Sequence, residues 1–182
     1  MPASDYVKVF LGLGGNQGDV TGSFLQLAAS IHDSQELALL QGSSIYRSKP
    51  CGTDEVSLAG QDDYLNQVIE VETSLSAIKL LEFTQSLEIR AGRNPDAERW
   101  SARPLDVDIL LYSDQRICLP HLKIPHPRML QRAFVLVPLL ELLAASQIPG
   151  FNVGVESLSQ LAVEQQLELD QVATKRYKNE FS

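Results

Sequence analysis

The order in which two kinds of hydrophobic periodicity follow one another is the feature that most limits the folds open to this chain. Apolar residues alternate along some segments, as in half-buried strands, and recur at i, i+4, i+7 and i+8 along others, as on one face of a helix. The order is strand, helix, strand, strand, helix, strand, over residues 7–13, 20–31, 37–47, 64–71, 76–91 and 106–112. This is the order of the ferredoxin-like βαββαβ sandwich, an α+β fold with its helices on one face of a sheet.

The two helices and the segments after them complete the expected domain. Asp19 is the expected N-cap of the first helix, and Gly92 is expected to end the second. The predicted core stripes are Val20, Phe24, Leu27, Ala28 and Ile31 in the first helix, and Leu80, Phe83, Leu87 and Ala91 in the second. A hairpin through residues 113–115 is expected to lead into a strand at 117–119, and the apolar run 135–143 to complete the core.

The length of 182 residues fits one domain. We therefore expect a single domain over residues 1–182, with a core at about 6–143. The extra C-terminal elements form an extension over residues 150–182, with a short amphipathic helix within 153–169.

The last predicted strand begins with two acids, Asp106 and Asp108. Residues i and i+2 of a strand point to the same face, so the two carboxylates converge. Hard oxygen ligands suit Mg²⁺, and Arg99 and Arg103 just upstream suit a polyphosphate. For an isolated Asp-x-Asp, however, a strand start with solvated or arginine-paired acids is the simpler interpretation and is favoured on this spacing alone.

The distribution of charge separates this strand from the rest of the chain. Residues 90–132 hold seven Arg and one Lys against five acids, a net charge of +3, whereas the remainder of the chain carries −11. An acidic protein with its arginines in one segment is suited to a small anion rather than to long nucleic acid. Two distant cysteines, and the absence of a signal peptide or long apolar run, predict free thiols and a cytoplasmic protein.

Other candidate residues carry little information by themselves. The Gly-rich turn at residues 14–18 matches neither the P-loop nor the Gly-x-Gly-x-x-Gly pattern, so we interpret it as a tight turn. Gln85 and Glu88 share one helix face, for which a solvated surface is the simpler interpretation. His126 is flanked by Pro125 and Pro127, which exclude a helix interior without assigning a role.

A set of short motifs follows in a fixed order along the chain, from about residue 7 to residue 141. They are Leu13-Gly14-Gly15-Asn16 with Gly18-Asp19, Ser44-x-Tyr46-x-Ser48, Tyr64-Leu65-Asn66, Gly92-Arg93, Arg99-Trp100, Arg103-x-Leu105-Asp106-Val107-Asp108-Ile109-Leu110, Pro125-His126-Pro127-Arg128 and Arg132-x-Phe134-Val135-Leu136-x-Pro138-Leu139. Taken together and in this order, the motifs resemble the 6-hydroxymethyl-7,8-dihydropterin pyrophosphokinase family of the folate pathway.

The resemblance implies a transfer of pyrophosphate from ATP to a pterin alcohol, with release of AMP. It implies that Asp106 and Asp108 bind two Mg²⁺ ions, and that Arg93 and Arg103 stabilise the moving phosphoryl charge. The implied pterin contacts are Ser48, Cys51, Tyr64, Asn66, Trp100 and Phe134. The implied ATP contacts are Gln85, Glu88, Arg99, Ile109, His126 and Arg132. ATP and the pterin are the expected partners of a monomer that binds neither nucleic acid nor membrane.

Five features depart from the family pattern. Pro95 stands where a second basic residue is common, Ser101-Ala102 replaces a Gly-Pro, and Pro104 replaces a threonine. The loop over residues 52–63 is long, and the C-terminal extension carries no family motif. Two other functions stay open at this point: a catalytically silent nucleotide- or RNA-binding module, and a Mg²⁺-dependent phosphohydrolase. The RNA-binding version requires paired exposed aromatic residues on central strands, and the sequence lacks the alternating aromatic pattern that would supply them.

Overall fold

The computed structural model describes residues 6–50, 60–97, 101–143 and 170–173. In this part of the chain six strands form one antiparallel sheet in the order β5-β1-β4-β3-β8, with β2 also paired to β4. The strands of the sheet are β1 (Val7–Gly15), β2 (Leu37–Gly42), β3 (Ile45–Ser48), β4 (Tyr64–Thr73), β5 (Asp106–Tyr112) and β8 (Asp170–Ala173). The α-helices of the described residues are α1 (Val20–His32), α3 (Ala77–Arg90) and α4 (Ala133–Leu142).

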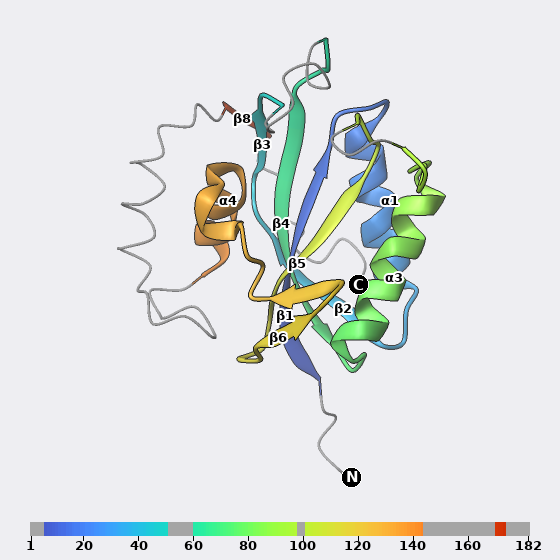
Figure 1. The fold of residues 1–182 in the computed structure, drawn as a ribbon, viewed down its shortest axis with the longest axis vertical. Coiled ribbons are helices and arrows are strands. Elements are labelled where there is room, and N and C mark those ends of the chain that lie inside the picture. Colours follow the sequence, from blue (N-terminus) through green and yellow to red (C-terminus); the bar gives the residue numbers. More distant parts are fainter. Residues whose placement is uncertain (1–5, 51–59, 98–100, 144–169, 174–182) are drawn as a thin grey trace.

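The helices divide the core between the two faces of the sheet. Figure 1 shows α1 and α3 together on one face and α4 on the other. One cluster of buried apolar side chains lies beneath α1 and α3, and a second lies beneath α4, built around Val68, Leu110 and Leu136. The expectation that helices cover one face is therefore confirmed for the first two, whereas the apolar run at 135–143 forms a third helix over the opposite face.

The first predicted helix is confirmed in its limits, its cap and its core stripe. The Asp19 side chain accepts a hydrogen bond from the main-chain N–H of Gly22 at 2.8 Å, which satisfies one of the free donors of the first turn. The buried residues of α1 are the five that the periodicity predicts: Val20, Phe24, Leu27, Ala28 and Ile31.

The second predicted helix ends as expected but buries a different set of residues. Gly92 has a φ of +100°, and the N–H groups of Gly92 and Arg93 donate to the carbonyls of Ile89 and Glu88, the pattern of a Schellman cap. Leu80 and Leu87 are buried as predicted, while Phe83 and Ala91 are only partly buried. Thr84 and Glu88, which are polar, are buried instead.

The single strand predicted over residues 37–47 is wrong, because two residues interrupt it. Ser43 lies between β2 and β3 and replaces a strand residue in pairing with β4: its N–H donates to the Val68 carbonyl and its hydroxyl accepts from the Val68 N–H. The short polar side chain thus satisfies main-chain groups that a regular ladder would otherwise pair. Both halves of the segment still pair with β4.

The predicted hairpin between the last strand and residues 117–119 is also wrong. After β5 the chain turns at Ser113, whose N–H donates to the Lys8 carbonyl, and β6 (Ile117–Leu119) pairs with β7 (Leu122–Ile124) in a separate two-stranded sheet. A short 3-10 helix, Met129–Gln131, then leads into α4. His126 donates its main-chain N–H to the Leu110 carbonyl, so the segment after β7 returns to β5.

None of the helices in the described ranges has the length and apolar character that crossing a bilayer requires. The amphipathic helix predicted within residues 153–169 lies outside the described residues, as does most of the loop over 52–63. Strand β8, which belongs to the C-terminal extension, pairs with β3 at the end of the sheet.

Candidate functional site

The two acids of β5 lie at the end of the sheet where β5 and β1 meet. Asp106 pairs with Gly14 and Asp108 with Gly12, so both carboxylates lie on the sheet face opposite α1 and α3. Val107, between them, packs in the core under those helices. The side chains of Asp106 and Asp108 are 33% and 38% exposed, so both remain accessible to a ligand.

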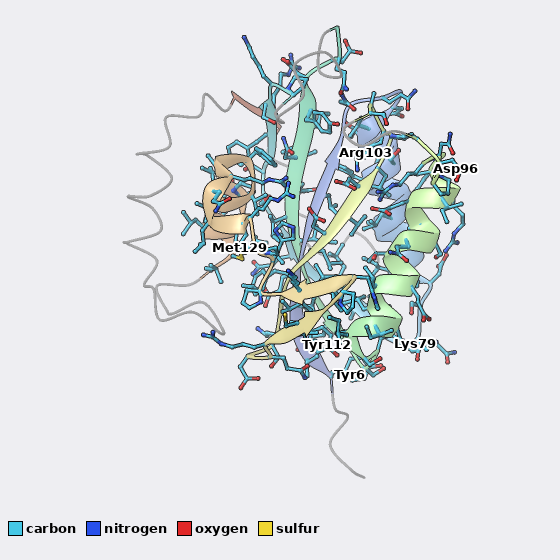
Figure 2. The ribbon with its side chains drawn as sticks, viewed as in Figure 1. Tyr6, Lys79, Asp96, Arg103, Tyr112 and Met129 are labelled. Atoms are coloured by element: carbon cyan, nitrogen blue, oxygen red, sulfur yellow. The ribbon has the colours of Figure 1, made fainter. Side chains whose placement is uncertain are left out.

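Two arginines converge on the first of these acids. Arg103 Nη1 lies 2.9 Å from Asp106 Oδ1, and Arg93 Nη1 lies 3.3 Å from the same oxygen. Figure 2 labels Arg103 near the start of β5. Both arginines belong to the connection between α3 and β5, residues 91–105, and they lie ten positions apart in it, so their guanidinium groups meet only in the folded chain.

The sequence favours a solvated helix surface for Gln85 and Glu88, and for Glu88 this prediction is wrong, because the residue is only 3% exposed. Its Oε1 accepts from the main-chain N–H of Val107 at 2.7 Å, and its Oε2 lies 2.5 Å from Arg93 Nη1. Glu88 therefore fastens α3 to the outer edge of β5 and orients Arg93 toward Asp106. Burial raises the pKa of Glu88 from 4.5 to about 7, against the opposing effects of these two donors.

This raised pKa predicts a pH dependence of stability that Glu88→Gln removes. The folded protein holds the Glu88 proton more tightly than the unfolded chain, so the free energy of unfolding falls as pH rises from about 4.5 to about 7, by up to about 3 kcal/mol from this group. Urea unfolding of both proteins at pH 5 and pH 8 checks this. We expect a smaller decrease in the variant, and equal decreases would contradict the assignment.

The second acid faces a histidine and a third arginine. His126 Nε2 lies 3.8 Å from Asp108 Oδ2, and Arg132 Nη1 lies 4.0 Å from the same oxygen. Burial raises the pKa of Asp108 and lowers that of His126, so burial disfavours the charged form of each. The Arg132 guanidinium also lies over the Phe134 ring, 5.5 Å from its centroid, which holds it beside α4.

A pocket lies between the sheet and the first turn of α4, and we call it the slot. Its walls include Ser48, Tyr64, Asn66 and Phe134, four of the six residues implied to contact a pterin. Asn66 donates to the Ser48 hydroxyl at 2.9 Å, so the two are held as a pair. Gly12 and Gly14 also line the slot, where the absence of a Cβ lets a flat ring approach the strand closely.

A second, larger pocket opens on the other side of the acids, and we call it the cleft. It is lined by Gln85, Glu88, Arg93, His126 and Arg128, among others. Slot and cleft share a small set of residues: Arg103, Asp106, Asp108 and Arg132. The acids and two arginines therefore stand where an occupant of the slot would meet an occupant of the cleft.

The other predicted site residues do not all reach this place. Ile109 packs in the core under α1 and α3, so only its main chain is available to a ligand. Cys51, Arg99 and Trp100 lie outside the described residues. Pro95, Ser101, Ala102 and Pro104, which depart from the family pattern, all line the cleft.

Asn16 is a site residue to which the sequence assigned no role. Its Oδ1 accepts from the Arg103 N–H at 3.0 Å, while its own N–H donates to the Arg103 carbonyl at 2.9 Å. Its Nδ2 donates to Gln61 Oε1 and to the Asp62 carbonyl. Asn16 thus joins the Arg103 segment to the chain that enters β4. The available signal was an amide residue directly after two glycines at a strand end.

Replacement of Asn16 by alanine is expected to lower both stability and turnover. The change leaves the Arg103 N–H without its partner, which costs about 1–3 kcal/mol where the group stays buried, and frees the Arg103 segment to move. Chemical unfolding and steady-state kinetics measure the two effects. Gln61→Ala is the matched control, because it removes one acceptor and leaves Arg103 bonded; equal effects of the two changes would contradict the argument.

The donor set at the acids fits Mg²⁺ better than a metal that needs a full protein cage. Within the described ranges no cluster of three His, Cys, Asp or Glu side chains is close enough to hold a metal. Mg²⁺ needs only one or two carboxylates when water and phosphate supply the remaining oxygens. Asp106 and Asp108, each about one-third exposed between two pockets and close to Arg93, Arg103 and Arg132, provide that arrangement.

Comparisons with known proteins agree on one family. A family model described as 7,8-dihydro-6-hydroxymethylpterin-pyrophosphokinase (HPPK) matches residues 10–144. The Bacillus subtilis protein named 2-amino-4-hydroxy-6-hydroxymethyldihydropteridine pyrophosphokinase is 38% identical over 133 residues, which cover 73% of this chain and 76% of that protein. The Haemophilus influenzae protein of the same name is 34% identical over 164 residues, covering 90% of this chain and 99% of its own length.

Solved structures show the same fold. The Plasmodium falciparum HPPK-DHPS structure with pteroate superposes with a TM-score of 0.66 at 14% identity, covering 91% of this chain. The chain corresponds to only 44% of that polypeptide. A structure of a single-substitution variant of the same protein, with STZ-DHP, gives a TM-score of 0.65 at 14% identity over 90% of this chain.

Proposed function

This chain belongs to the 7,8-dihydro-6-hydroxymethylpterin-pyrophosphokinase family, and from that membership we propose that it transfers pyrophosphate from ATP to the hydroxymethyl group of 6-hydroxymethyl-7,8-dihydropterin. As a family member it is a pyrophosphokinase, an ATP-dependent diphosphotransferase of folate biosynthesis. The observation that carries the specific reaction is the position of Asp106 and Asp108, which line both the slot and the cleft. The pterin occupies the slot and ATP the cleft.

In the proposed reaction the pterin hydroxyl oxygen attacks the β-phosphorus of ATP. A new bond forms between that oxygen and the β-phosphorus, the bond from the β-phosphorus to the oxygen bridging it to the α-phosphorus breaks, and AMP leaves with that bridging oxygen. The hydroxyl proton passes to solvent. Because such transfers depend mainly on positioning and charge stabilisation, a dedicated general base is not required.

Arginine and acid side chains divide the work on the phosphates. Arg103 and Arg93, both within 3.3 Å of Asp106, are placed to donate to the transferred group as its charge shifts toward AMP. Asp106 and Asp108 would hold the two Mg²⁺ ions that we propose. When bound, Mg²⁺ neutralises phosphate charge and fixes the orientation of the triphosphate.

The slot residues orient the pterin. Asn66 and Ser48 present an amide and a hydroxyl to the polar edge of the heterocycle, while Tyr64 and Phe134 contact its faces or rim. Trp100 and Cys51 remain proposed pterin contacts. On the cleft side we propose nucleotide contacts from the remaining set: Gln85, Glu88, Arg99, the main chain of Ile109, His126 and Arg132.

We further propose that residues 1–182 form one cytoplasmic, monomeric domain of ferredoxin-like topology. In that interpretation β2 and β3 together replace the second strand of the βαββαβ unit, because both pair with β4. ATP and the pterin are its proposed partners, with neither nucleic acid nor membrane.

Nucleotide product analysis tests the proposal. The protein is incubated with ATP and Mg²⁺, with and without 6-hydroxymethyl-7,8-dihydropterin. We expect AMP only in the presence of the pterin, in equal amount to pterin diphosphate. Nucleotide hydrolysis without the pterin would support a phosphohydrolase instead, and binding of both ligands without AMP would leave only a binding module.

A further inference from the structure

Helix α4 carries, on one of its sides, both a residue that lines the slot and an acidic residue far from the slot. Phe134 lies in its first turn, beside the slot, and Glu141 in its last turn. Glu141 follows Phe134 by seven positions, about two helical turns, so both side chains lie on the same side of α4. The helix has no side-chain hydrogen bond at its N-cap and contains Pro138, which lacks an N–H donor. Its placement therefore depends on its packing and on the contacts of its C-terminal end.

Glu141 makes those contacts with both of its carboxylate oxygens. Oε2 accepts from the main-chain N–H of Ser44 at 2.8 Å, and Oε1 accepts a short hydrogen bond from the Tyr46 hydroxyl. Ser44 is only 5% exposed, so the carboxylate satisfies a buried main-chain donor just before β3. Burial and the bond to Glu141 both raise the pKa of Tyr46, which keeps the phenol protonated as a donor.

The strand that receives these contacts is also a wall of the slot. Tyr46 pairs with Asn66 on β4, and Ser48, two residues farther along β3, accepts a hydrogen bond from Asn66. Residues directly opposite on antiparallel strands, and residues two apart on one strand, point to the same face. Tyr46, Ser48 and Asn66 therefore share the sheet face that α4 covers.

These contacts form a continuous path around the slot. It runs from Phe134 along α4 to Glu141, across to Tyr46, along β3 to Ser48, and across to Asn66. We propose that Glu141 is a positioning residue for the pterin: it fixes α4 on β3 and so sets the spacing between Phe134 and the Asn66–Ser48 pair. The proposal rests on the proposed function, because it assigns the slot to the pterin. Glu141 itself lines neither the slot nor the cleft.

Three variants separate this role from general stabilisation. Glu141→Ala removes both hydrogen bonds and Tyr46→Phe removes one, whereas Glu141→Gln keeps an oxygen for Ser44 and an amide for the Tyr46 oxygen. We expect Glu141→Ala to weaken pterin binding about tenfold, the scale of one lost charge-assisted hydrogen bond, with a smaller loss for Tyr46→Phe. Glu141→Gln is expected to retain most of the affinity.

The measurement is calorimetric titration of each protein with the pterin in the presence of Mg²⁺ and a non-hydrolysable ATP analogue, at a temperature where circular dichroism shows every variant folded. Steady-state kinetics then compares KM for the pterin with KM for ATP, and only the former is expected to rise. Glu82→Ala, which removes an exposed acid paired with Lys79 on α3, is the matched control.

Unchanged pterin affinity in Glu141→Ala, or an equal rise in KM for ATP, would overturn the proposal, as would an equally large loss in Glu141→Gln. Calorimetry does not depend on turnover, so a wild-type protein that binds the pterin but transfers nothing still tests the role of Glu141. A wild-type protein that binds no pterin would overturn the proposed function, and this inference with it.

Discussion

Replacing either Asp106 or Asp108 by alanine is expected to lower kcat for pyrophosphate transfer by at least about 10³-fold, which corresponds to about 4 kcal/mol of lost transition-state stabilisation. The effect is this large because each acid has a proposed Mg²⁺ ion to hold and stands between the two pockets. Asp106 also fixes Arg103 and Arg93, so its removal leaves both guanidinium groups without their shared acceptor. We expect the larger loss at Asp106.

The two variants are expected to remain folded. Both side chains are about one-third exposed, and two carboxylates on one strand face repel each other, so removing one relieves repulsion. The measurements are product formation at saturating substrates and a titration of activity against Mg²⁺, in which the variants should need more metal. Asp114→Asn, in the turn after the same strand, is the matched control. Wild-type turnover in either alanine variant would contradict the metal assignment.

Local patterns predicted the parts of the fold that local chemistry determines. The five buried residues of α1 follow from a 3.6-residue period, and the Gly92 cap follows from the freedom of glycine at positive φ. The break between β2 and β3 could not be predicted from such local patterns. It depends on Ser43 meeting Val68 across the sheet, and that contact exists only after β4 has paired.

The site shows the same division between local and tertiary causes. The convergence of Asp106 and Asp108 follows from the period of two in a strand. The burial of Glu88 does not, since a glutamate on a helix is usually solvated. It is buried because β5 is an edge strand whose Val107 N–H needs an acceptor, and α3 places a carboxylate there. Asn16 likewise acquires its role only when the Arg103 segment packs against the end of β1.

Two adjacent glycines at the end of β1 predict opposite consequences for the same substitution. A Cβ on Gly15 would lie 2.5 Å from the Pro104 carbonyl oxygen and 3.0 Å from Val20 Cγ1, closer than packed atoms approach. The Pro104 oxygen belongs to the main chain, so a change of side-chain rotamer cannot relieve this clash. A Cβ on Gly14 would have only Asn66 Oδ1 within contact range, at 3.6 Å, but would project into the slot.

Gly15→Ala is therefore expected to displace the Arg103–Asp106 segment and to destabilise the protein by about 1–3 kcal/mol, the usual cost of overpacking. A shift of about 1 Å in catalytic groups can cost about 10²-fold in rate, so kcat should fall strongly even where the variant is folded. Gly14→Ala should change stability little and weaken pterin binding instead. Chemical unfolding, calorimetry with the pterin and steady-state kinetics on both variants distinguish these outcomes. If both alanines produced the same loss of stability, the close packing of Pro104 on Gly15 would not be what positions Arg103 and Asp106.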